Sequence, residues 1–145
     1  MKYRFKYESL LKYRIFLKDE AELQFSKALA RNRELNRKRR RILSTIDRML
    51  GEAQDLLSKG VTAERYRHMV AYVEKLKERV KMLEREIARS NREVEAAREK
   101  LVSKMVDVKV LERLSVRDFE IYRKQMKLKE AKLSDQLYLV RLKST

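Results

Sequence analysis

Apolar side chains recur along this chain at alternating intervals of three and four residues. The longest uninterrupted series comprises Tyr66, Met69, Val73, Leu76, Val80, Leu83, Ile87, Ser90, Val94, Ala97 and Leu101. A second series with the same rhythm comprises Ala28, Asn32, Leu35, Arg39, Ile42, Ile46, Met49, Ala53 and Leu56. This spacing places one side chain per turn on the same helix face and is typical of the a and d positions of a coiled coil. The pattern predicts two long helices that bury these two stripes, here called the seam, against each other.

Few positions can interrupt a helix, because the chain has no Pro and only two Gly, Gly51 and Gly60. Gly60 suits a left-handed helix C-cap, and Thr62 suits the N-cap of a following helix. A loop this short makes consecutive helices antiparallel. We therefore predict an all-α fold: one coiled-coil domain over residues 1–145, in which two long helices form an antiparallel hairpin. The first helix covers about residues 3–58, the loop about 58–62 and the second helix about 63–140.

Two places in this rhythm are expected to be irregular. Upstream of residue 28 the seam follows Leu10, Arg14, Leu17, Ala21 and Gln24, but Phe25 competes with Gln24. The second helix slips near Lys104 and Met105, and the rhythm resumes at Val108, Leu111, Ser115, Phe119, Tyr122 and Met126. Such insertions locally unwind or overwind a coiled coil.

The second helix is longer than the first, so we expect it to overhang at the C-terminus. The predicted overhang, residues 112–145, has no intramolecular partner but still carries many apolar side chains. A lone helix is only marginally stable in water. One interpretation is a docking segment that becomes ordered on a partner; the other is self-association or a frayed tail.

The composition adds a strong positive charge, with a formal net charge of +16 and 41% charged residues. This charge calls for an anionic counterpart, such as an acidic protein patch, nucleic acid or a membrane surface. The chain has no Cys, which excludes disulfides and thiolate metal sites. It also lacks an apolar run of membrane-spanning length and a signal-peptide core, so we expect a soluble, unexported protein.

Catalytic chemistry has little support in this sequence. There is one histidine, His68, and neither glycine lies in a phosphate-binding loop. The carboxylates mostly alternate with basic residues, as on a solvated helix face. We therefore expect no enzyme activity, no catalytic residue, no metal, no cofactor and no small-molecule substrate.

A basic patch is formed by five consecutive residues, Arg37, Lys38, Arg39, Arg40 and Arg41. Five consecutive residues wrap the whole circumference of a helix, so they form no stripe that fits a nucleic-acid groove. The patch admits three interpretations: a solvated surface, a site for an acidic protein, and a nucleic-acid site. Just past the loop, Tyr72 lies beside the seam and four residues before Leu76, so the two side chains could form a face for a partner.

Two stretches resemble one known family. The opening Phe5-Lys-Tyr-Glu-Ser-Leu10-Leu11-Lys-Tyr-Arg14, followed by Asp19-Glu20-Ala21-Glu22, is similar to the start of the flagellar export protein FliJ family. The stretch Lys109-Val-Leu111-Glu112-Arg113-Leu114, followed by Phe119 and Tyr122-Arg123, resembles the C-terminal region of that family. Length, charge and the absence of helix breakers agree along essentially the whole chain.

This resemblance implies a non-catalytic coiled-coil stalk of the flagellar type III export apparatus, needed for motility and chemotaxis. Such a stalk binds the hexameric export ATPase, promotes its assembly and activity, links it to the membrane export gate, and handles export chaperones. It implies a monomer in the cytoplasm, peripheral to the inner membrane at the flagellar basal body. The gate would contact Tyr72 and Leu76. The candidate ATPase contacts are Leu111, Leu114, Phe119, Tyr122, Arg123 and Met126.

Three alternatives remain at the level of the sequence. A nucleic-acid-binding coiled coil would use the basic patch, although we do not expect nucleic acid to be the partner. A stalk protein of an injectisome would share the mechanism of the flagellar protein. A structural protein would oligomerise through the overhang.

Overall fold

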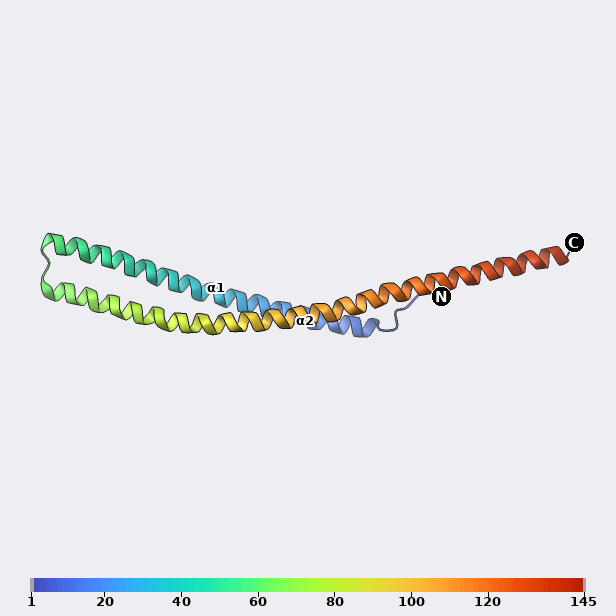
Figure 1. Cartoon of the computed structure of the whole chain (residues 1–145), viewed down its shortest axis with the longest axis horizontal. Coiled ribbons are helices and arrows are strands. Elements are labelled where there is room, and N and C mark those ends of the chain that lie inside the picture. Colours follow the sequence, from blue (N-terminus) through green and yellow to red (C-terminus); the bar gives the residue numbers. More distant parts are fainter. Residues whose placement is uncertain (1, 145) are drawn as a thin grey trace. The chain divides into compact units, whose positions relative to one another are not determined.

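The computed structural model describes residues 2–144 and consists of two long helices. Helix α1 covers Glu8–Lys59 and helix α2 covers Ala63–Lys143. They pack against each other as an antiparallel hairpin (Figure 1). The predicted all-α hairpin, with a second helix that outruns the first, is confirmed.

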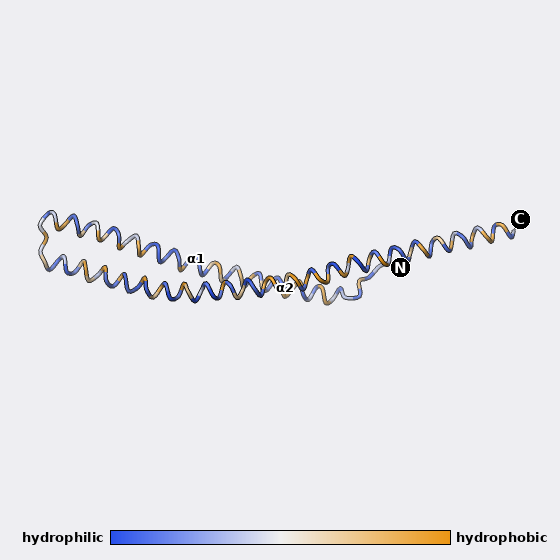
Figure 2. Tube along the Cα trace, in the orientation of Figure 1, coloured by the Kyte–Doolittle hydropathy of each residue, from blue (hydrophilic) through white to orange (hydrophobic). Residues whose placement is uncertain are grey.

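The chain divides into two compact units, and each helix contributes to both. Unit 2 contains residues 21–101, and unit 1 combines residues 1–20 with residues 102–145. Along both helices, polar and apolar residues alternate within each turn (Figure 2). This is the hydropathy pattern expected of helices with a single buried face.

Contacts across unit 2 establish the antiparallel register. From the loop outward, Arg39 pairs with Glu84 at 3.5 Å, and Asn32 donates a hydrogen bond to Asn91 at 2.8 Å. Farther along, the Arg98 guanidinium lies 5.7 Å from the ring centre of Phe25. The residue numbers on α1 fall as those on α2 rise, in equal steps. The two stripes predicted from the sequence therefore face each other in one continuous alignment.

The best-packed apolar cluster of unit 2 lies toward the loop. Ile46 of α1 is buried against Val73, Leu76 and Val80 of α2, and each of the four is at most 7% exposed. Ile42, Leu43 and Met49 pack around them. Toward the other end of the unit the seam becomes polar, since Asn32 donates a hydrogen bond to Ser90 at 3.2 Å. Polar seam positions specify alignment at a cost in stability.

The seam passes through Phe25 near Gln24, since Phe25 is partly buried and Gln24 is exposed. The intervals from Leu17 to Ala21 and from Ala21 to Phe25 are then both four residues, which is the irregularity expected there, and Leu17 and Lys18 are both partly buried. The large apolar ring gains more from burial than an amide does. The contact of Phe25 with Arg98 adds to its preference for the seam.

The loop is built as the sequence predicted. Gly60 has a φ of +81°, the left-handed conformation of a helix C-cap. The carbonyl of Thr62 accepts a hydrogen bond from the amide of Tyr66 at 3.2 Å, which makes Thr62 the N-cap of α2, immediately before its first residue Ala63.

In unit 1, the first helix begins later than predicted. We expected helix from about residue 3, but residues 2–7, here called the N-terminal strap, are not helical. The amide of Leu11 donates to the carbonyl of Tyr7 at 2.9 Å, and α1 starts at Glu8. An extended chain advances about 3.3 Å per residue against about 1.5 Å in a helix. The strap therefore carries its aromatic rings farther along α2 than a helix of the same length could.

The expected slip of α2 near Lys104 is absent. Lys104 is partly buried at the seam, and it is followed at the regular spacing by Val108 and Leu111, which are each 4% exposed. A lysine can occupy such a position because its aliphatic stem packs while its ammonium group reaches water. The next seam positions are Ser115, Asp118 and Tyr122, so Phe119, 42% exposed, lies beside the seam and not on it.

The two glycines provide opposite tests of this fold. Replacing Gly60 with Ala should destabilise the hairpin by about 1–2 kcal/mol, because a side chain disfavours the left-handed backbone. Replacing Gly51, which lies within α1 with open space where a side chain would project, should stabilise it by about 0.5–1 kcal/mol. Thermal unfolding followed by circular dichroism measures both. A Gly60→Ala variant as stable as Gly51→Ala would contradict the loop conformation.

Candidate functional site

The N-terminal strap is held on α2 by aromatic contacts within unit 1. The ring of Tyr3 lies 5.1 Å from the ring centres of both Phe119 and Tyr122. Its hydroxyl donates a hydrogen bond of 2.6 Å to the Asp118 carboxylate. Phe5 is 8% exposed and meets the ring of Tyr7 edge-on at 5.9 Å. The strap thus buries aromatic surface where α2 no longer has α1 beside it.

The hydrogen bond to Asp118 also changes the acidity of Tyr3. That bond, with smaller contributions from desolvation and from the negative charge of the carboxylate, raises the pKa of Tyr3 to about 12. The neutral phenol is the form that fits the strap contact.

Sequence reasoning missed the strap, although a signal for it was present. Tyr3, Phe5 and Tyr7 alternate with Lys2, Arg4 and Lys6. A period of two residues is that of an extended chain and not of a helix. The partners Asp118 and Phe119 could not be identified this way, because nothing in the local pattern says where an extended segment will pack.

The unpartnered part of α2 is shorter than predicted. We expected it to begin at about Glu112, but Asp118, Phe119 and Tyr122 contact the strap. Leu111, a candidate ATPase contact, is 4% exposed and belongs to the packed part of unit 1. Leu114, another candidate, is 39% exposed. Leu111 therefore packs inside unit 1, whereas Leu114 lies on its surface.

From Arg123 onward, every described residue of α2 is exposed. This C-terminal segment, residues 123–143, carries an apolar series of its own, which lies in line with Phe119 and beside the buried seam, since Phe119 and Met126 are one heptad apart. Met126, Leu133, Leu137 and Val140 are spaced seven, four and three residues apart and share one helix face. They are 37%, 60%, 59% and 63% exposed. The segment therefore presents a ready coiled-coil face, here called the open stripe.

A second apolar group lies on the opposite side of the C-terminal segment. At about 100° per residue, Leu128, Tyr138 and Leu139 point away from the open stripe. All three are more than half exposed. Seven Lys or Arg side chains are distributed around the segment against only Glu130 and Asp135. A partner that satisfies both apolar groups has to contact the helix from more than one side and to present acidic groups.

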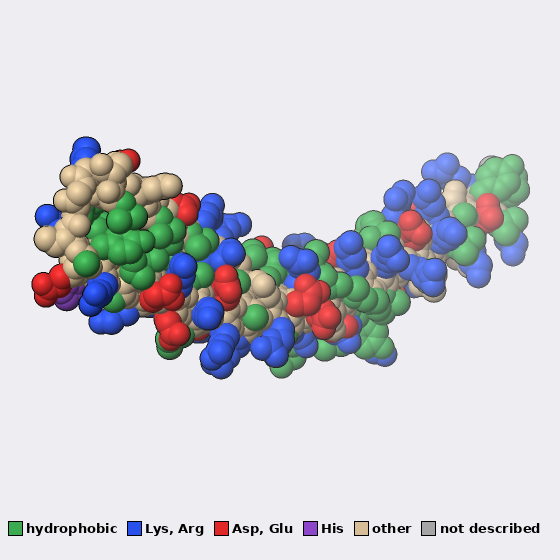
Figure 3. All heavy atoms as spheres, turned by 60° about the vertical axis from the view of Figure 1, so that its left-hand side comes forward, with side chains coloured by type: hydrophobic (Ala, Val, Ile, Leu, Met, Phe, Trp, Pro, Cys, Tyr) green, Lys and Arg blue, Asp and Glu red, His purple; other side chains and the backbone are tan. Residues whose placement is uncertain are grey.

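At the loop end of unit 2, the structure separates the two residues of the proposed gate contact. Tyr72 is 49% exposed, whereas Leu76 is 5% exposed in the hairpin core. Leu76 can hold the helix surface in place but offers almost no area to a partner. Exposed aliphatic area is instead supplied by Leu50, Leu57 and Val70, which help to line a groove of about 350 Å³. Hydrophobic side chains gather on this end of the hairpin in Figure 3.

The basic patch is divided among several roles. Arg37 pairs with Glu34 on its own helix at 3.7 Å, and Arg39 pairs across the seam with Glu84. The Nε atom of Arg39 is buried and makes no hydrogen bond in the described part of the chain, but it lies 3.5 Å from a carboxylate oxygen of Glu84. Lys38 and Arg41 line a groove with α2, and Arg40 is exposed. The five residues do not form a common basic surface.

The described residues hold neither a metal-binding cluster nor a membrane-spanning helix. Within residues 2–144, no cluster of His, Asp or Glu side chains has the makings of a metal site. Neither α1 nor α2 contains an apolar stretch that meets the length and charge requirements of a membrane span.

Comparison with known protein families decides the identity of the chain. The model of the family described as flagellar FliJ protein matches residues 2–142. The chain belongs to the FliJ family. No curated protein and no solved structure matches it.

Membership of the FliJ family makes this chain a component of flagellar protein export. The family is a structural or chaperone-like export component and is not known for enzyme activity. The match extends over the strap, the hairpin and nearly all of the C-terminal segment, so all three surfaces described above lie within the family region.

Burial within this FliJ-family chain separates structural from surface leucines. Replacing Leu111 with Ala should lower the free energy of unfolding by about 2–4 kcal/mol, because it leaves a cavity at a buried seam position. Replacing Leu114 with Ala should change it by no more than about 0.5 kcal/mol, as for exposed residues in general. Urea denaturation measures both. Equal losses would show that Leu114 is packed as firmly as Leu111.

Ionisation of the Tyr3 phenol should weaken the contact between the strap and α2 at high pH. Because its pKa is raised above the unfolded value of about 10, its contribution is complete below pH 10 and is lost as the pH rises toward 12. An ultraviolet titration of phenolate should show one late component that disappears in Tyr3→Phe and moves to lower pH in Asp118→Asn. An unchanged titration in both variants would contradict the contact.

Proposed function

We propose that this FliJ-family chain is a non-catalytic stalk that joins the hexameric flagellar export ATPase to the membrane export gate. In this proposal the C-terminal segment binds the ATPase and promotes its assembly and activity. The loop end of unit 2 contacts the gate. The chain would act in the cytoplasm at the inner face of the membrane, and chaperone escort would be a further role of the same protein.

The observation that carries the ATPase contact is the open stripe. It has the heptad-type spacing of a coiled-coil seam but is exposed throughout the described residues, and it begins where the strap contacts end. A surface helix with apolar groups on opposite sides suits an enclosing site, such as the central pore of a ring, better than a flat partner. The basic side chains between these groups favour association with acidic walls and increase its rate.

Within this proposal, the sequence candidates divide by exposure. Leu114, Phe119, Arg123 and Met126 are exposed enough to contact an ATPase directly. Tyr122 is partly covered by Tyr3, so the strap would share that contact. Leu111 would act by holding α2 in place.

For the gate contact, exposure favours Tyr72 as the residue that touches the partner. Half of its surface is free, and the core beneath it is the best-packed cluster of unit 2. Leu76 would support Tyr72 from within that core. Aromatic residues on a rigid base are frequent energetic centres of protein interfaces.

The alternative of nucleic-acid binding has weaker support. Two of the five basic-patch residues are paired with carboxylates, and the five point in different directions around α1. An injectisome stalk would use the same surfaces, and family membership favours the flagellar system.

The ATPase contact can be tested by titrating the chain into the flagellar export ATPase of the same host. Work at about 300 mM salt reduces the Debye length to roughly 6 Å and suppresses nonspecific charge contacts. Replacing Leu133 and Leu137 together with Ser should weaken stimulation of ATP hydrolysis about ten-fold or more, because two central anchors are removed. Truncation after Gln125 should abolish stimulation.

The matched control is Leu23→Ser with Val106→Ser, which removes two equally exposed aliphatic side chains elsewhere. It should stimulate like the native chain. Loss of stimulation in the control, or full stimulation by the truncated chain, would contradict a contact through the open stripe. Sedimentation of each variant shows whether the stripe binds a second copy instead.

A further inference from the structure

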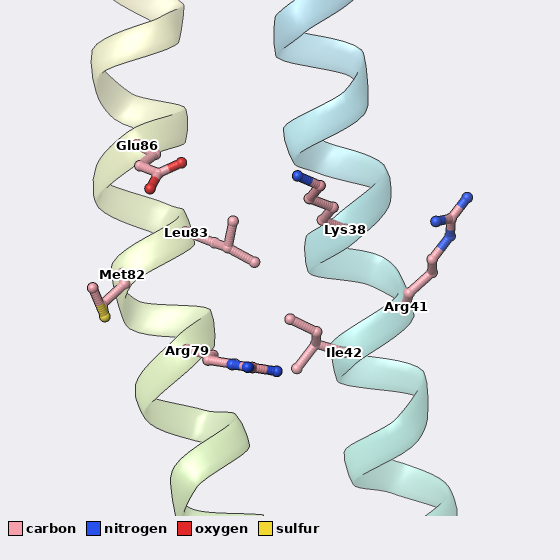
Figure 4. Close-up of a pocket in the computed structure, with 7 residues that line it drawn as sticks. All are labelled: Lys38, Arg41, Ile42, Arg79, Met82, Leu83 and Glu86. Carbon is pink, nitrogen blue, oxygen red and sulfur yellow. The ribbon is translucent and has the colours of Figure 1, made fainter.

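A groove runs between α1 and α2 in the middle of unit 2, with a volume of about 460 Å³. Ile42 of α1 and Leu83 of α2 point toward each other and form its floor (Figure 4). Met82, which is 63% exposed, extends the apolar surface along α2. The groove thus has an apolar base that is open to solvent over about two helical turns.

The edges of this groove are strongly basic. Lys38 and Arg41 line it from α1 and Arg79 lines it from α2, against one carboxylate, Glu86. Within residues 2–144, none of these four side chains forms an ion pair. The cross-helix ion pair of this region joins Arg39 of α1 to Glu84 of α2, and neither side chain lines the groove. Charge is therefore balanced on one side of the seam and unbalanced on the groove side.

We propose that this groove binds an acidic amphipathic helix of a partner protein. A groove between two antiparallel helices is where a third helix packs in a bundle, with its apolar residues on the floor and its polar residues at the edges. Carboxylates on such a helix would meet Lys38, Arg41 and Arg79. Apolar residues one turn apart would cover Ile42, Leu83 and Met82.

Charge and shape distinguish this occupant from the other candidates. A second copy of the chain carries the same net charge of +16, so its approach to a basic groove is repelled. Nucleic-acid phosphates would satisfy the cations but would leave the apolar floor without a partner. The groove belongs to unit 2 and shares no residue with the open stripe or with Tyr72. The proposal therefore does not depend on the ATPase and gate contacts.

The test uses a fluorescein-labelled helical peptide of about 15 residues, with Leu at intervals of three and four and Glu at the flanking positions. Fluorescence anisotropy should show saturable binding to the full chain, weaker at about 300 mM than at about 50 mM salt. A peptide with the same residues in shuffled order, and one with Lys in place of Glu, should bind at least about ten-fold more weakly. A photo-crosslinking version of the peptide should label residues 38–42 and 79–86.

Matched variants separate the groove from the general charge of the chain. Arg79→Glu should weaken binding about five-fold or more, whereas Arg85→Glu, an exposed arginine outside the groove lining, should change it less than about two-fold. Met82→Ser should weaken it, and Met105→Ser, another exposed methionine, should not. All four positions are on the surface, and circular dichroism checks that helix content is retained.

Four outcomes would overturn the proposal. These are no binding of the native peptide, equal binding of the shuffled peptide, equal losses in Arg79→Glu and Arg85→Glu, and crosslinks outside the two groove segments. Sedimentation provides one more: a concentration-dependent dimer that Met82→Ser abolishes would identify a second copy as the occupant.

Discussion

Burial along one seam is the constraint on which the rest of this molecule depends. Two helices have no further layer behind them, so a seam side chain has only the opposite helix to pack against. Along unit 2 this burial continues without a break, and it tolerates Asn32 and Arg39 because each finds a partner on α2. Lys104 keeps the rhythm in unit 1 through its aliphatic stem. Where the opposite helix ends, apolar side chains on α2 have nothing to cover them.

The N-terminal strap covers some of the apolar side chains of α2 that lie beyond the start of α1, but not all of them. Tyr3 and Phe5 supply aromatic area in an extended segment and cover α2 as far as Tyr122. Beyond that point an apolar series in line with Phe119, beside the seam, runs through Met126, Leu133 and Leu137 with no covering segment among the described residues. An apolar stripe kept at seam spacing on an unpaired helix is costly in water unless a partner buries it. This conflict between local pattern and exposure is why the C-terminal segment is the strongest candidate for an intermolecular contact in a flagellar export component.

Packing quality also differs along unit 2, and this affects how its surfaces can act. The core of Ile46, Val73, Leu76 and Val80 gives the part of the unit toward the loop a cluster of four buried apolar side chains. Tyr72 and the groove floor at Leu83 lie on helix surfaces attached to this core. Rigid surfaces lose little conformational entropy on binding. An unbalanced set of basic side chains beside a rigid apolar floor is therefore suited to selecting a partner by charge, whereas the C-terminal segment is suited to being enclosed.

The sequence by itself determined the helices, their antiparallel pairing, the loop at Gly60 and Thr62, and most of the seam, because a period of three and four residues and a lack of helix breakers leave few other folds. It also carried the resemblance to the FliJ family. Only the tertiary structure decided the choice of Phe25 over Gln24, the place of Lys104 on the seam and the burial of Leu76 and Leu111. Each of these depends on which side chain the opposite helix presents at that level. The strap contact of Tyr3 with Asp118 is the clearest case, since the two residues are 115 positions apart and no local pattern records where they meet.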